Sequence, residues 1–592
     1  MRLEPLWIEA ATDDGPSRAP LTGIPVTAVL GPLEVRVDGG SFPTFTWSVA
    51  NTTDRPVRVR SVALVFGVVD AAEPLRLFRN GYQSWSPTGV ATFGVDVDPS
   101  TIANFEFLQS AHHADQRRVA DGELRSEMVT VLRDADVRGE GQPVLIGFDG
   151  GDQHDGTLRI RRDDAGGIVL AAEAFLGDVV LAASESRLLH GITIDDESGV
   201  DAASKLDRWA SEVGRRHGAR VAAPYQVGWC SWYHYFHDVT ESALRSNLAR
   251  SGDWPFEVFQ LDDGYQSAIG DWLTTNDKFP SELDEIAAAI AAEGRTPGLW
   301  IAPFLAAPDS RVATEHPEWM ARHLAADGRD TGPLRGWWNE PWGGGDSGFM
   351  SSLDTTNPQV LEHLEDLGRS LVEAGFPYLK LDFTFAPSID GGWSDPGFTP
   401  AQRVRAGYDA FRRGTGDDAF ILGCGAPLSH VLGVVDGNRI GQDVAPLWEL
   451  DASEEVVAGY LRVQPATQYA YGNTVARSFL HRRFWLNDPD CLMLRTAETD
   501  LSPEAARTWA HTVAVSGGMA LVSDDLALLD ADARSLLDEV VAIGREVDAS
   551  AMRGPAPRST DLLEHAVPQH LDAAGWSLTV DPATGSSILE RP

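Results

Sequence analysis

Two charged residues, Lys380 and Asp382, stand two positions apart near the end of the otherwise apolar segment 376–383 (FPYLKLDF). Residues two apart on a strand point to the same face, so the ammonium and the carboxylate would project side by side. A buried charge is costly unless it is paired or used. Because chemistry collects at the carboxyl ends of parallel strands, the pair could belong to a site. On this segment alone, it could equally be an ion pair that holds a core together.

Residues of the same kinds follow other segments that we predict as strands. Carboxylates and cations hold hydroxyl groups in charge-assisted hydrogen bonds, and an indole covers the apolar face of a sugar ring, so the set suits a polyhydroxylated ligand. Two carboxylates on opposite sides of a sugar are also what glycoside hydrolysis requires. The residues concerned are Trp229, Cys230, Trp232, Asp262, Asp263, Trp300, Lys380, Asp382, Cys424, Arg439, Asp443, Asn487, Asp488 and Asp490.

Strand-like and helical segments alternate in the part of the chain that carries these residues. Eight such strands with intervening helices predict a (β/α)8 barrel of the TIM type. An open doubly wound sheet would normally carry a glycine-rich nucleotide-binding turn, and the sequence has none. The eight predicted strands are 225–230, 256–261, 296–304, 376–383, 419–425, 438–443, 482–487 and 517–523.

The first 200 residues show short apolar or alternating segments separated by turn residues, without a long helical segment. This pattern predicts an antiparallel β-sandwich over residues 1–200. We expect a helical linker over 201–221, the catalytic barrel over 222–545 and a small C-terminal β domain over 546–592. Inside the sandwich, residues 81–89 (GYQSWSPTG) form an aromatic loop. Trp85 in this loop is either a core anchor or a residue that reaches into the cleft of a neighbouring domain.

The 592 residues include 48 basic and 87 acidic ones, which gives a net charge of −39. This balance argues against nucleic acid and anionic membranes as partners, because both need a basic footprint. The three cysteines form no CxxC pair and no even framework, which favours a reduced compartment. The N-terminus lacks the basic and apolar regions of a secretory signal, and no apolar run approaches the ~20 residues that span a bilayer. We therefore expect a soluble cytoplasmic protein.

Six motifs, in order along the chain, resemble those of glycoside hydrolase family 36, specifically its bacterial, melibiase-like α-galactosidases. Their order, spacing and flanking residues agree with that family, and its β-sandwich, (β/α)8 barrel and C-terminal β domain match the segments predicted above. GYQSWS also resembles the segment that donates a tryptophan to the active-site rim in such enzymes. The six motifs are GWCSWYHYF (228–236), FQLDDGYQ (259–266), LKLDFTFA (379–386), ILGCGAPL (421–428), RIGQDVAPLW (439–448) and WLNDPDCLML (485–494).

The resemblance implies retaining hydrolysis of α-linked galactose from small oligosaccharides, with Asp382 as nucleophile and Asp443 as general acid/base, and without a metal or organic cofactor. We expect Lys380 to keep Asp382 ionised, and the nearby carboxylates to help Asp443 hold its proton. Arg439, four residues before Asp443, would oppose that effect if it pointed at Asp443. The resemblance implies that the substrate-binding residues are Trp85, Trp229, Asp262, Asp263, Trp300, Lys380, Cys424 and Arg439.

The chain departs from the family pattern directly after the nucleophile. Many larger members have Met-Asn where this chain has Phe383-Thr384, which bears on the substrate more than on the mechanism. The segment 335–349 (RGWWNEPWGGGDSGF) matches no family motif. Its indoles would form an aglycone platform or simply cover the barrel top.

Other functions remain open at the level of sequence. A metal-dependent hydrolase would have to use His234 and His237, which form no HxH pair, and sensitivity to chelators would separate the two mechanisms. A non-catalytic sugar-binding protein has no need of two catalytic carboxylates. Within the family, the alternatives are an α-N-acetylgalactosaminidase, for which Cys424 is the position to examine, and a transglycosidase. We expect Asp488 and Asp490 to be structural turn residues, and a homo-oligomer is possible.

Overall fold

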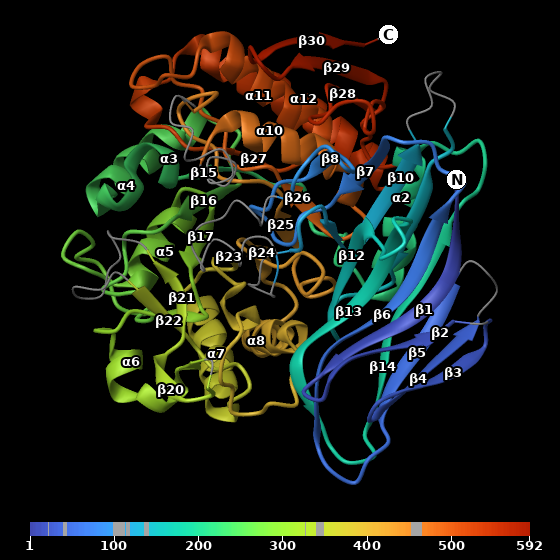
Figure 1. Cartoon of the computed structure of the whole chain (residues 1–592). Helices are drawn as coiled ribbons and strands as arrows, with labels where there is room; N and C mark the ends of the chain where they lie inside the picture. The colour runs from blue at the N-terminus through green and yellow to red at the C-terminus, as the bar shows by residue number, and fades with distance from the viewer. Residues whose placement is uncertain are drawn as a thin grey trace.

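The computed structural model describes residues 1–21, 23–39, 44–98, 113, 119–134, 141–325, 327–338, 349–450 and 465–591. Figure 1 shows the N-terminal strands to one side of a barrel, with the C-terminal strands lying against the last helices. This arrangement confirms the predicted fold class of β-sandwich, (β/α)8 barrel and small C-terminal β domain.

The N-terminal domain consists of two antiparallel sheets that pack face to face. Phe45 of one sheet and Phe66 of the other lie with ring centroids 6.2 Å apart inside a shared apolar core. The first sheet has the order β2-β1-β6-β13-β12-β9, with β1 Arg2–Thr12, β2 Gly15–Pro20, β6 Val57–Val69, β9 Leu124–Glu127, β12 Asp155–Arg162 and β13 Ile168–Leu181. The second has the order β3-β4-β5-β14-β11-β10-β7-β8, with β3 Val26–Leu30, β4 Leu33–Gly39, β5 Thr44–Asn51, β7 Leu75–Arg79, β8 Gly89–Thr92, β10 Val129–Asp134, β11 Val144–Phe148 and β14 Ser186–Asp195.

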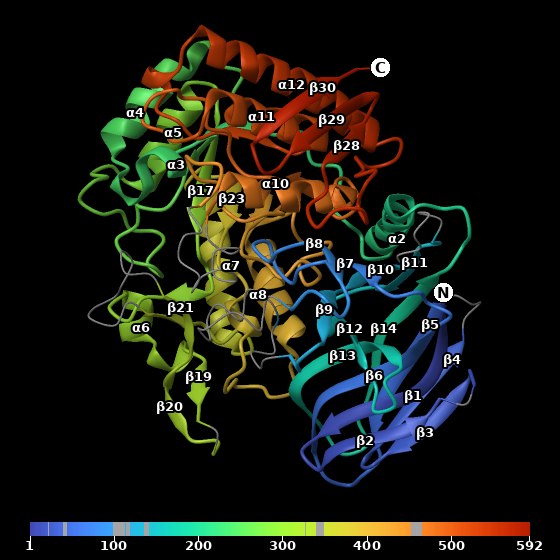
Figure 2. The same ribbon diagram turned by 45° about the horizontal axis from the view of Figure 1, so that its top comes forward.

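Helix α2 (Ala202–Arg216) leads from the sandwich to the barrel and begins at Asp201, whose side chain caps it by accepting from the Ser204 amide. Trp209 donates to the Phe148 carbonyl of the sandwich, and its ring lies 5.8 Å from that of Phe484 in the barrel. Helix α2 therefore contacts both domains; Figure 2 shows it beside the strands of the sandwich.

The barrel contains all eight strands that the sequence predicts, and all its pairings are parallel. Strands β26 and β27 lie at the two ends of the sheet order, and the Met519 amide donates to the Asn487 carbonyl between them, so the barrel is nearly closed. The order is β26-β25-β24-β23-β17-β16-β15-β27, with β15 Val227–Cys230, β16 Val258–Leu261, β17 Thr296–Ile301, β23 Tyr378–Leu381, β24 Phe420–Gly423, β25 Gly437–Arg439, β26 Leu486–Asp488 and β27 Ala520–Val522.

The helices of the barrel begin and end where local sequence dictates. Helix α8 starts at Pro400, and Thr399 and Gln402 form a capping box at this end. The helix is followed by Gly416, whose φ of 75° suits glycine. The α-helices are α3 Trp232–Tyr235, α4 Glu241–Arg250, α5 Leu283–Ala292, α6 Arg311–Glu315, α7 Pro358–Glu373, α8 Pro400–Thr415, α10 Thr467–Ala476, α11 Pro503–Ser516 and α12 Ala531–Ala551. Short strands β18 Leu305–Ala306, β19 Arg322–Leu324, β20 Asp330–Pro333, β21 Arg335–Trp338 and β22 Phe349–Ser352 lie in the loop after β17.

The C-terminal sheet is a meander of β28 (His570–Ala573), β29 (Trp576–Asp581) and β30 (Ser586–Glu590). It packs on α11 and α12, where the Thr508 hydroxyl donates to the Ser587 hydroxyl at 2.9 Å. Helix α12 runs to Ala551, so the boundary expected between residues 545 and 546 falls inside a helix.

The loop 81–89 of the sandwich is fixed to the barrel by a buried cation. Arg477 donates to the carbonyls of Ser84 at 2.7 Å and of Gln83 and Ser86 at 3.1 Å. Asn473 adds a bond from its side-chain amide to the Ser86 carbonyl at 2.9 Å. The barrel thus holds the loop that carries Trp85 in place within one chain.

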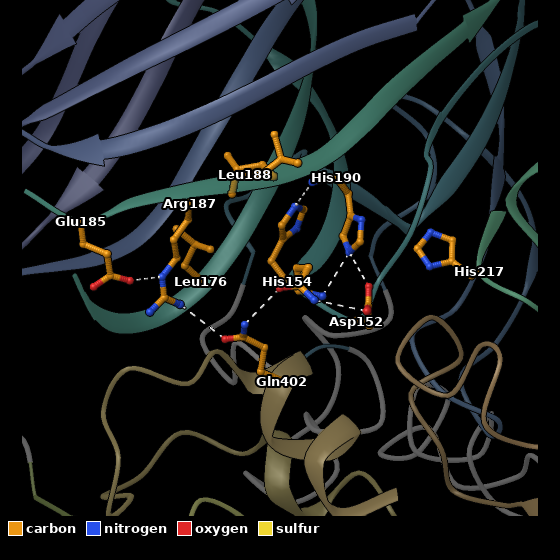
Figure 3. Close-up of a pocket in the computed structure, with 11 residues that line it drawn as sticks. Asp152, His154, Leu176, Glu185, Arg187, Leu188, His190, His217 and Gln402 are labelled. Carbon is orange, nitrogen blue, oxygen red and sulfur yellow. Dashed lines mark hydrogen bonds and ion pairs between the residues drawn. The ribbon is translucent and has the colours of Figure 1, made fainter. Parts of the chain in front are cut away.

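A pocket of about 610 Å³ opens elsewhere along the junction of sandwich and barrel (Figure 3). Its polar side chains are largely occupied with one another. Arg187 pairs with Glu185 at 2.7 Å, and Asp152 lies 3.1 Å from His190. None of the predicted site residues lines it, and we assign it to the packing of the two domains.

Candidate active site

The ends of β16 and β23 bring together the first pair of predicted site residues. Lys380 donates from Nζ to Oδ2 of Asp262 at 2.9 Å, and both side chains are almost fully buried. Burial is the largest single effect and would lower the pKa of Lys380, but Asp262, together with the weaker effects of Cys424 and Cys230, holds that pKa well above the ordinary value. Gln260 also donates to Asp262, as does the Cys230 thiol. Lys380 and Asp262 thus form a buried ion pair at the barrel mouth, which we call the charged floor.

Asp382 stands at the end of β23, 8% exposed. Its Oδ2 accepts from the Trp300 indole at 3.0 Å, and its Oδ1 accepts from the Phe383 amide at 2.8 Å. Burial nevertheless raises the pKa of Asp382 above its usual value, against the lowering effects of Lys380, Trp300 and the Cys424 thiol. The Lys380 charge lowers the pKa of Asp382, in the expected direction, but burial has the larger effect. In the geometry of the site, the Lys380 ammonium pairs with Asp262 and not with Asp382.

Asp443 lies in the segment after β25, and one third of its side chain is exposed. Arg439 points at it, with Nη1 donating to Oδ1 at 2.8 Å. Asp382 and Asp443 both follow the carboxyl ends of barrel strands, and the negative charge of Asp443 contributes to the raised pKa of Asp382. The sequence left open whether Arg439 points at Asp443, which would work against Asp443 holding its proton. In the structure, Arg439 does point at Asp443.

Two carboxylates that we expected to be structural turn residues also bind Arg439. Its Nε donates to Asp488 at 3.2 Å, and its Nη2 lies 2.7 Å from Asp490. Burial would lower the pKa of Arg439, but these carboxylates raise it well above the usual value. One buried guanidinium therefore serves three carboxylates, of which Asp443 is the most exposed.

Asp263 is held separately from Asp262, although the two are adjacent in the sequence. His237 places its Nδ1 3.1 Å from Oδ2 of Asp263, and the Gln266 side chain donates to Oδ1. His237 thus supports a carboxylate. Among the described residues, no group of three or more His, Cys, Asp and Glu side chains is arranged to hold a metal ion.

An aromatic cluster lies beside Asp382 and joins the two domains. Trp85 of the sandwich places its ring 5.1 Å from that of Phe383 and 5.8 Å from that of Trp337. Phe385 completes the cluster, with its ring 6.1 Å from that of Trp85. The Trp85 Nε1 is buried without a hydrogen-bond partner among the described residues. Trp85 is therefore a half-buried residue at the contact between the sandwich and the barrel.

Phe383 adopts a φ of 53°, which is strained for a residue with a β-carbon. This conformation lets the Phe383 amide turn back onto the Asp382 carboxylate while its ring joins the cluster. Phe383, one of the two residues that depart from the family pattern, therefore donates to the predicted nucleophile. The Thr384 hydroxyl donates to the Cys424 carbonyl, which ties β23 to the end of β24.

Trp229 does not join this group. Its indole is fully buried, stacks on Phe259 at 4.3 Å and donates to the Asp524 carbonyl. Its neighbour Cys230 contacts Asp262, and adjacent residues on a strand point to opposite faces. We predicted that Trp229 would bind substrate, and its position does not support that prediction.

Sequence reasoning missed several residues that the structure brings to the site. Tyr233 donates its hydroxyl to Asp490, and burial raises the pKa of that phenol well above its usual value. His237 and Gln266, which fix Asp263, also escaped notice as supporting groups. Tyr233 and Gln266 lie inside the quoted motifs and His237 directly follows one, so proximity to these motifs was the available signal. Of the segment 335–349, Trp337 joins the cluster, whereas Trp342 lies outside the described residues.

The arrangement can support displacement at a sugar carbon. It offers a buried carboxylate with two hydrogen-bond donors, a second carboxylate that reaches solvent, and a fixed set of charges able to bind hydroxyl groups.

Comparison with known proteins agrees with this interpretation. Residues 222–335 match the Melibiase family model. The chain is 27% identical over 160 residues to the α-galactosidase AgaA of Geobacillus stearothermophilus, which is 26% of this chain and 20% of that protein. It is 32% identical over 97 residues to an α-galactosidase of Escherichia coli, which is 15% of this chain and 14% of that protein. These sequence matches thus span about a fifth or less of the relatives' length.

Similarity to solved structures extends much further along the chain. The α-galactosidase TtGalA of Thermus thermophilus, in complex with p-nitrophenyl α-D-galactopyranoside, aligns with a TM-score of 0.65 and 27% identity. That alignment covers 88% of this chain and 95% of the other. The structure of AgaA, a family 36 enzyme, aligns with a TM-score of 0.60 and 15% identity over 97% of this chain and 79% of the other, which shows a shared fold.

Proposed function

Starting from the place of this chain among the melibiase-like glycoside hydrolases of family 36, we propose that it is a retaining α-galactosidase. It removes terminal α-linked galactose from oligosaccharides by double displacement, with Asp382 as nucleophile and Asp443 as acid/base. The observation that carries the proposal is the buried Asp382, held by Trp300 and Phe383 at the same end of the barrel as the more exposed Asp443.

In the first step, a carboxylate oxygen of Asp382 forms a bond to the anomeric carbon while the bond to the leaving oxygen breaks. Asp443 gives its proton to that oxygen, so the released sugar leaves as a neutral alcohol. In the second step, Asp443 takes a proton from water, whose oxygen replaces Asp382 at the anomeric carbon. Two inversions leave the α configuration unchanged.

The two carboxylates differ in the way that these roles require. Asp382 is fixed by two donors that favour a single orientation of its carboxylate. Asp443 is one third exposed, so a proton can exchange with solvent at its oxygen. Because burial raises the pKa of Asp382, the ionised nucleophile is lost at a higher pH than for an ordinary aspartate as the solution is acidified. Activity should therefore fall on the acidic side above the usual aspartate range.

We assign sugar binding to the charges around this pair. Asp262 and Lys380 form a fixed unit that can accept from and donate to neighbouring hydroxyl groups. Asp263, oriented by His237 and Gln266, can accept a further hydroxyl. Arg439 and Cys424 complete the set of polar groups that we assign to the galactose.

We assign the leaving sugar to Trp85 and Trp337, the two half-buried indoles of the cluster, which pack on the buried rings of Phe383 and Phe385. Indole faces cover the apolar side of a sugar ring. Complexes of TtGalA with stachyose and of an AgaA variant with raffinose support oligosaccharides as substrates.

The proposal includes a cytoplasmic location, which the three buried, unpaired cysteines support. In the described part of the chain, no helix has the length and apolar character needed to span a membrane. Assembly into a homo-oligomer stays a prediction.

The test compares hydrolysis of aryl α-galactoside, α-glucoside and α-N-acetylgalactosaminide by the wild type and by Asp382→Ala with added azide. We expect activity on the galactoside alone, its loss in the variant, and partial recovery with azide as a β-galactosyl azide product. Full activity of the variant would refute the role of Asp382. Activity confined to another sugar would retain the mechanism and refute the substrate.

A further inference from the structure

Asp490 has no part in the proposed reaction, yet it contacts the acid/base segment at two points. Its Oδ1 lies 2.7 Å from Nη2 of Arg439, the guanidinium that also donates to Asp443. Its Oδ2 accepts from the amide of Val444, the residue after Asp443, at 2.9 Å. Asp490 is therefore linked to Asp443 through a side chain and through the backbone.

The backbone of Asp490 is held in an unusual conformation. Its φ is 94°, in a region that residues with a β-carbon rarely adopt. The Asp490 amide donates to Asp488 at 2.9 Å, and the Cys491 amide donates to the Asp490 carboxylate at 2.7 Å. The Tyr233 hydroxyl adds another donor to this carboxylate. Strain of this kind persists only where surrounding contacts hold it, and here they aim a buried carboxylate at Arg439.

We propose that Asp490 is the positioning residue for Asp443, and that it sets the orientation and the proton affinity of that carboxyl through Arg439 and Val444. The inference rests on the proposed function only in the role given to Asp443. It assigns Asp490 no contact with substrate.

The sign of the effect follows from one cation shared among three carboxylates. A negative charge on Asp490 competes with Asp443 for Arg439 and repels a negative charge on Asp443. Both effects favour the protonated form of Asp443, which is the form that a general acid needs. Replacing Asp490 by a neutral isostere leaves Arg439 free to stabilise the ionised form of Asp443.

Asp490 can carry this charge near neutral pH. Burial raises its pKa to about 7, against the lowering effect of Arg439. The negative charge of Asp490 is therefore present above about pH 7 and is lost as the solution is acidified. The charged and titratable groups that face Asp490 are Arg439, Asp443, Asp488, Lys380, Tyr233 and Cys491.

The test uses Asp490→Asn, with Asp524→Asn as the matched control. Asp524 is equally buried, pairs with Arg495 and accepts from the Leu494 amide, but among the described residues its carboxylate makes no hydrogen bond or ion pair with the acid/base segment. The first readout is kcat/KM against pH for galactosides whose leaving groups range from dinitrophenol to a sugar. The second is the titration of the Asp443 carboxyl by carbon-13 NMR on the full chain without substrate, with Asp443→Asn assigning the signal.

For Asp490→Asn we expect the alkaline limb of kcat/KM and the Asp443 titration to move about 0.5–1 pH unit lower. Loss of activity should grow with the basicity of the leaving group, from under about 3-fold for dinitrophenol to about 10–100-fold for a sugar. The control should move neither quantity. An equal loss on every substrate with an unmoved Asp443 titration would overturn the inference.

Tyr233→Phe provides a second route if Asp490→Asn fails to fold. It removes one donor to the Asp490 carboxylate, which weakens the ionised form, so both readouts should move in the same direction by a smaller amount. An unmoved Asp443 titration in folded Tyr233→Phe would also overturn the inference. A wild type that is inactive on α-galactosides would refute the proposed function alone, because the NMR titration needs no substrate.

Discussion

Replacing Trp300 by phenylalanine tests how the barrel supports the proposed nucleophile. The indole donates to Oδ2 of Asp382 at 3.0 Å, and phenylalanine keeps an aromatic ring without that donor. A hydrogen bond to a charged group contributes about 1.5–3 kcal/mol, and one pKa unit corresponds to about 1.4 kcal/mol. Loss of the bond should therefore move the acidic limb of kcat/KM about one to two pH units higher.

The assay is kcat/KM for an activated aryl α-galactoside over a wide pH range, because this quantity reports the ionisations of the free enzyme. Trp229→Phe is the matched control. It removes a buried indole from β15, two strands away in the same barrel, and the bond that is lost goes to the Asp524 carbonyl. Both variants should lose stability, but only Trp300→Phe should shift the acidic limb. An unshifted limb in folded Trp300→Phe would refute the support that we assign to this hydrogen bond.

Two further variants test the charged floor and the rim. Lys380→Met leaves Asp262 buried and unpaired, which should cost about 3–5 kcal/mol of stability. Adding Asp262→Asn should restore the denaturant midpoint but not activity, and a single variant as stable as the wild type would contradict the pairing. Trp85→Ala should raise KM for raffinose about 10-fold, as expected for the loss of ~1.4 kcal/mol of binding, with kcat nearly unchanged. A fall in kcat at constant KM would place Trp85 in the reaction itself.

The fold was largely predictable because its elements are encoded locally. Alternating apolar residues such as those of Val57–Val69 predict strands with a buried face, and helix ends such as Thr399-Pro400 have characteristic capping residues. Strands as short as Gly437–Arg439 were recovered because motif residues follow them. Strands β1–β3 and β7–β9 carry a weaker signal in the sequence, since several have weak alternation and depend on neighbours in their sheets.

The candidate site was predictable only in composition. The motif aspartates and Lys380 are visible in the sequence, and strand period two correctly places Lys380 and Asp382 on one face. Sequence spacing does not give the partner of each charge, because the partners come from other strands. Lys380 pairs with Asp262, 118 positions away, and Trp300 supports Asp382 from 82 positions away.

The sequence by itself therefore determined the succession of strands and helices and the kinds of side chain at the barrel mouth. Only the tertiary structure decided that burial raises the pKa of Asp382, that one guanidinium serves Asp443, Asp488 and Asp490, and that Trp229 faces away from the site. The physical reason is that secondary structure follows from neighbours along the chain. Charge state and side-chain contact depend on desolvation and on groups that the closed barrel brings together from distant segments.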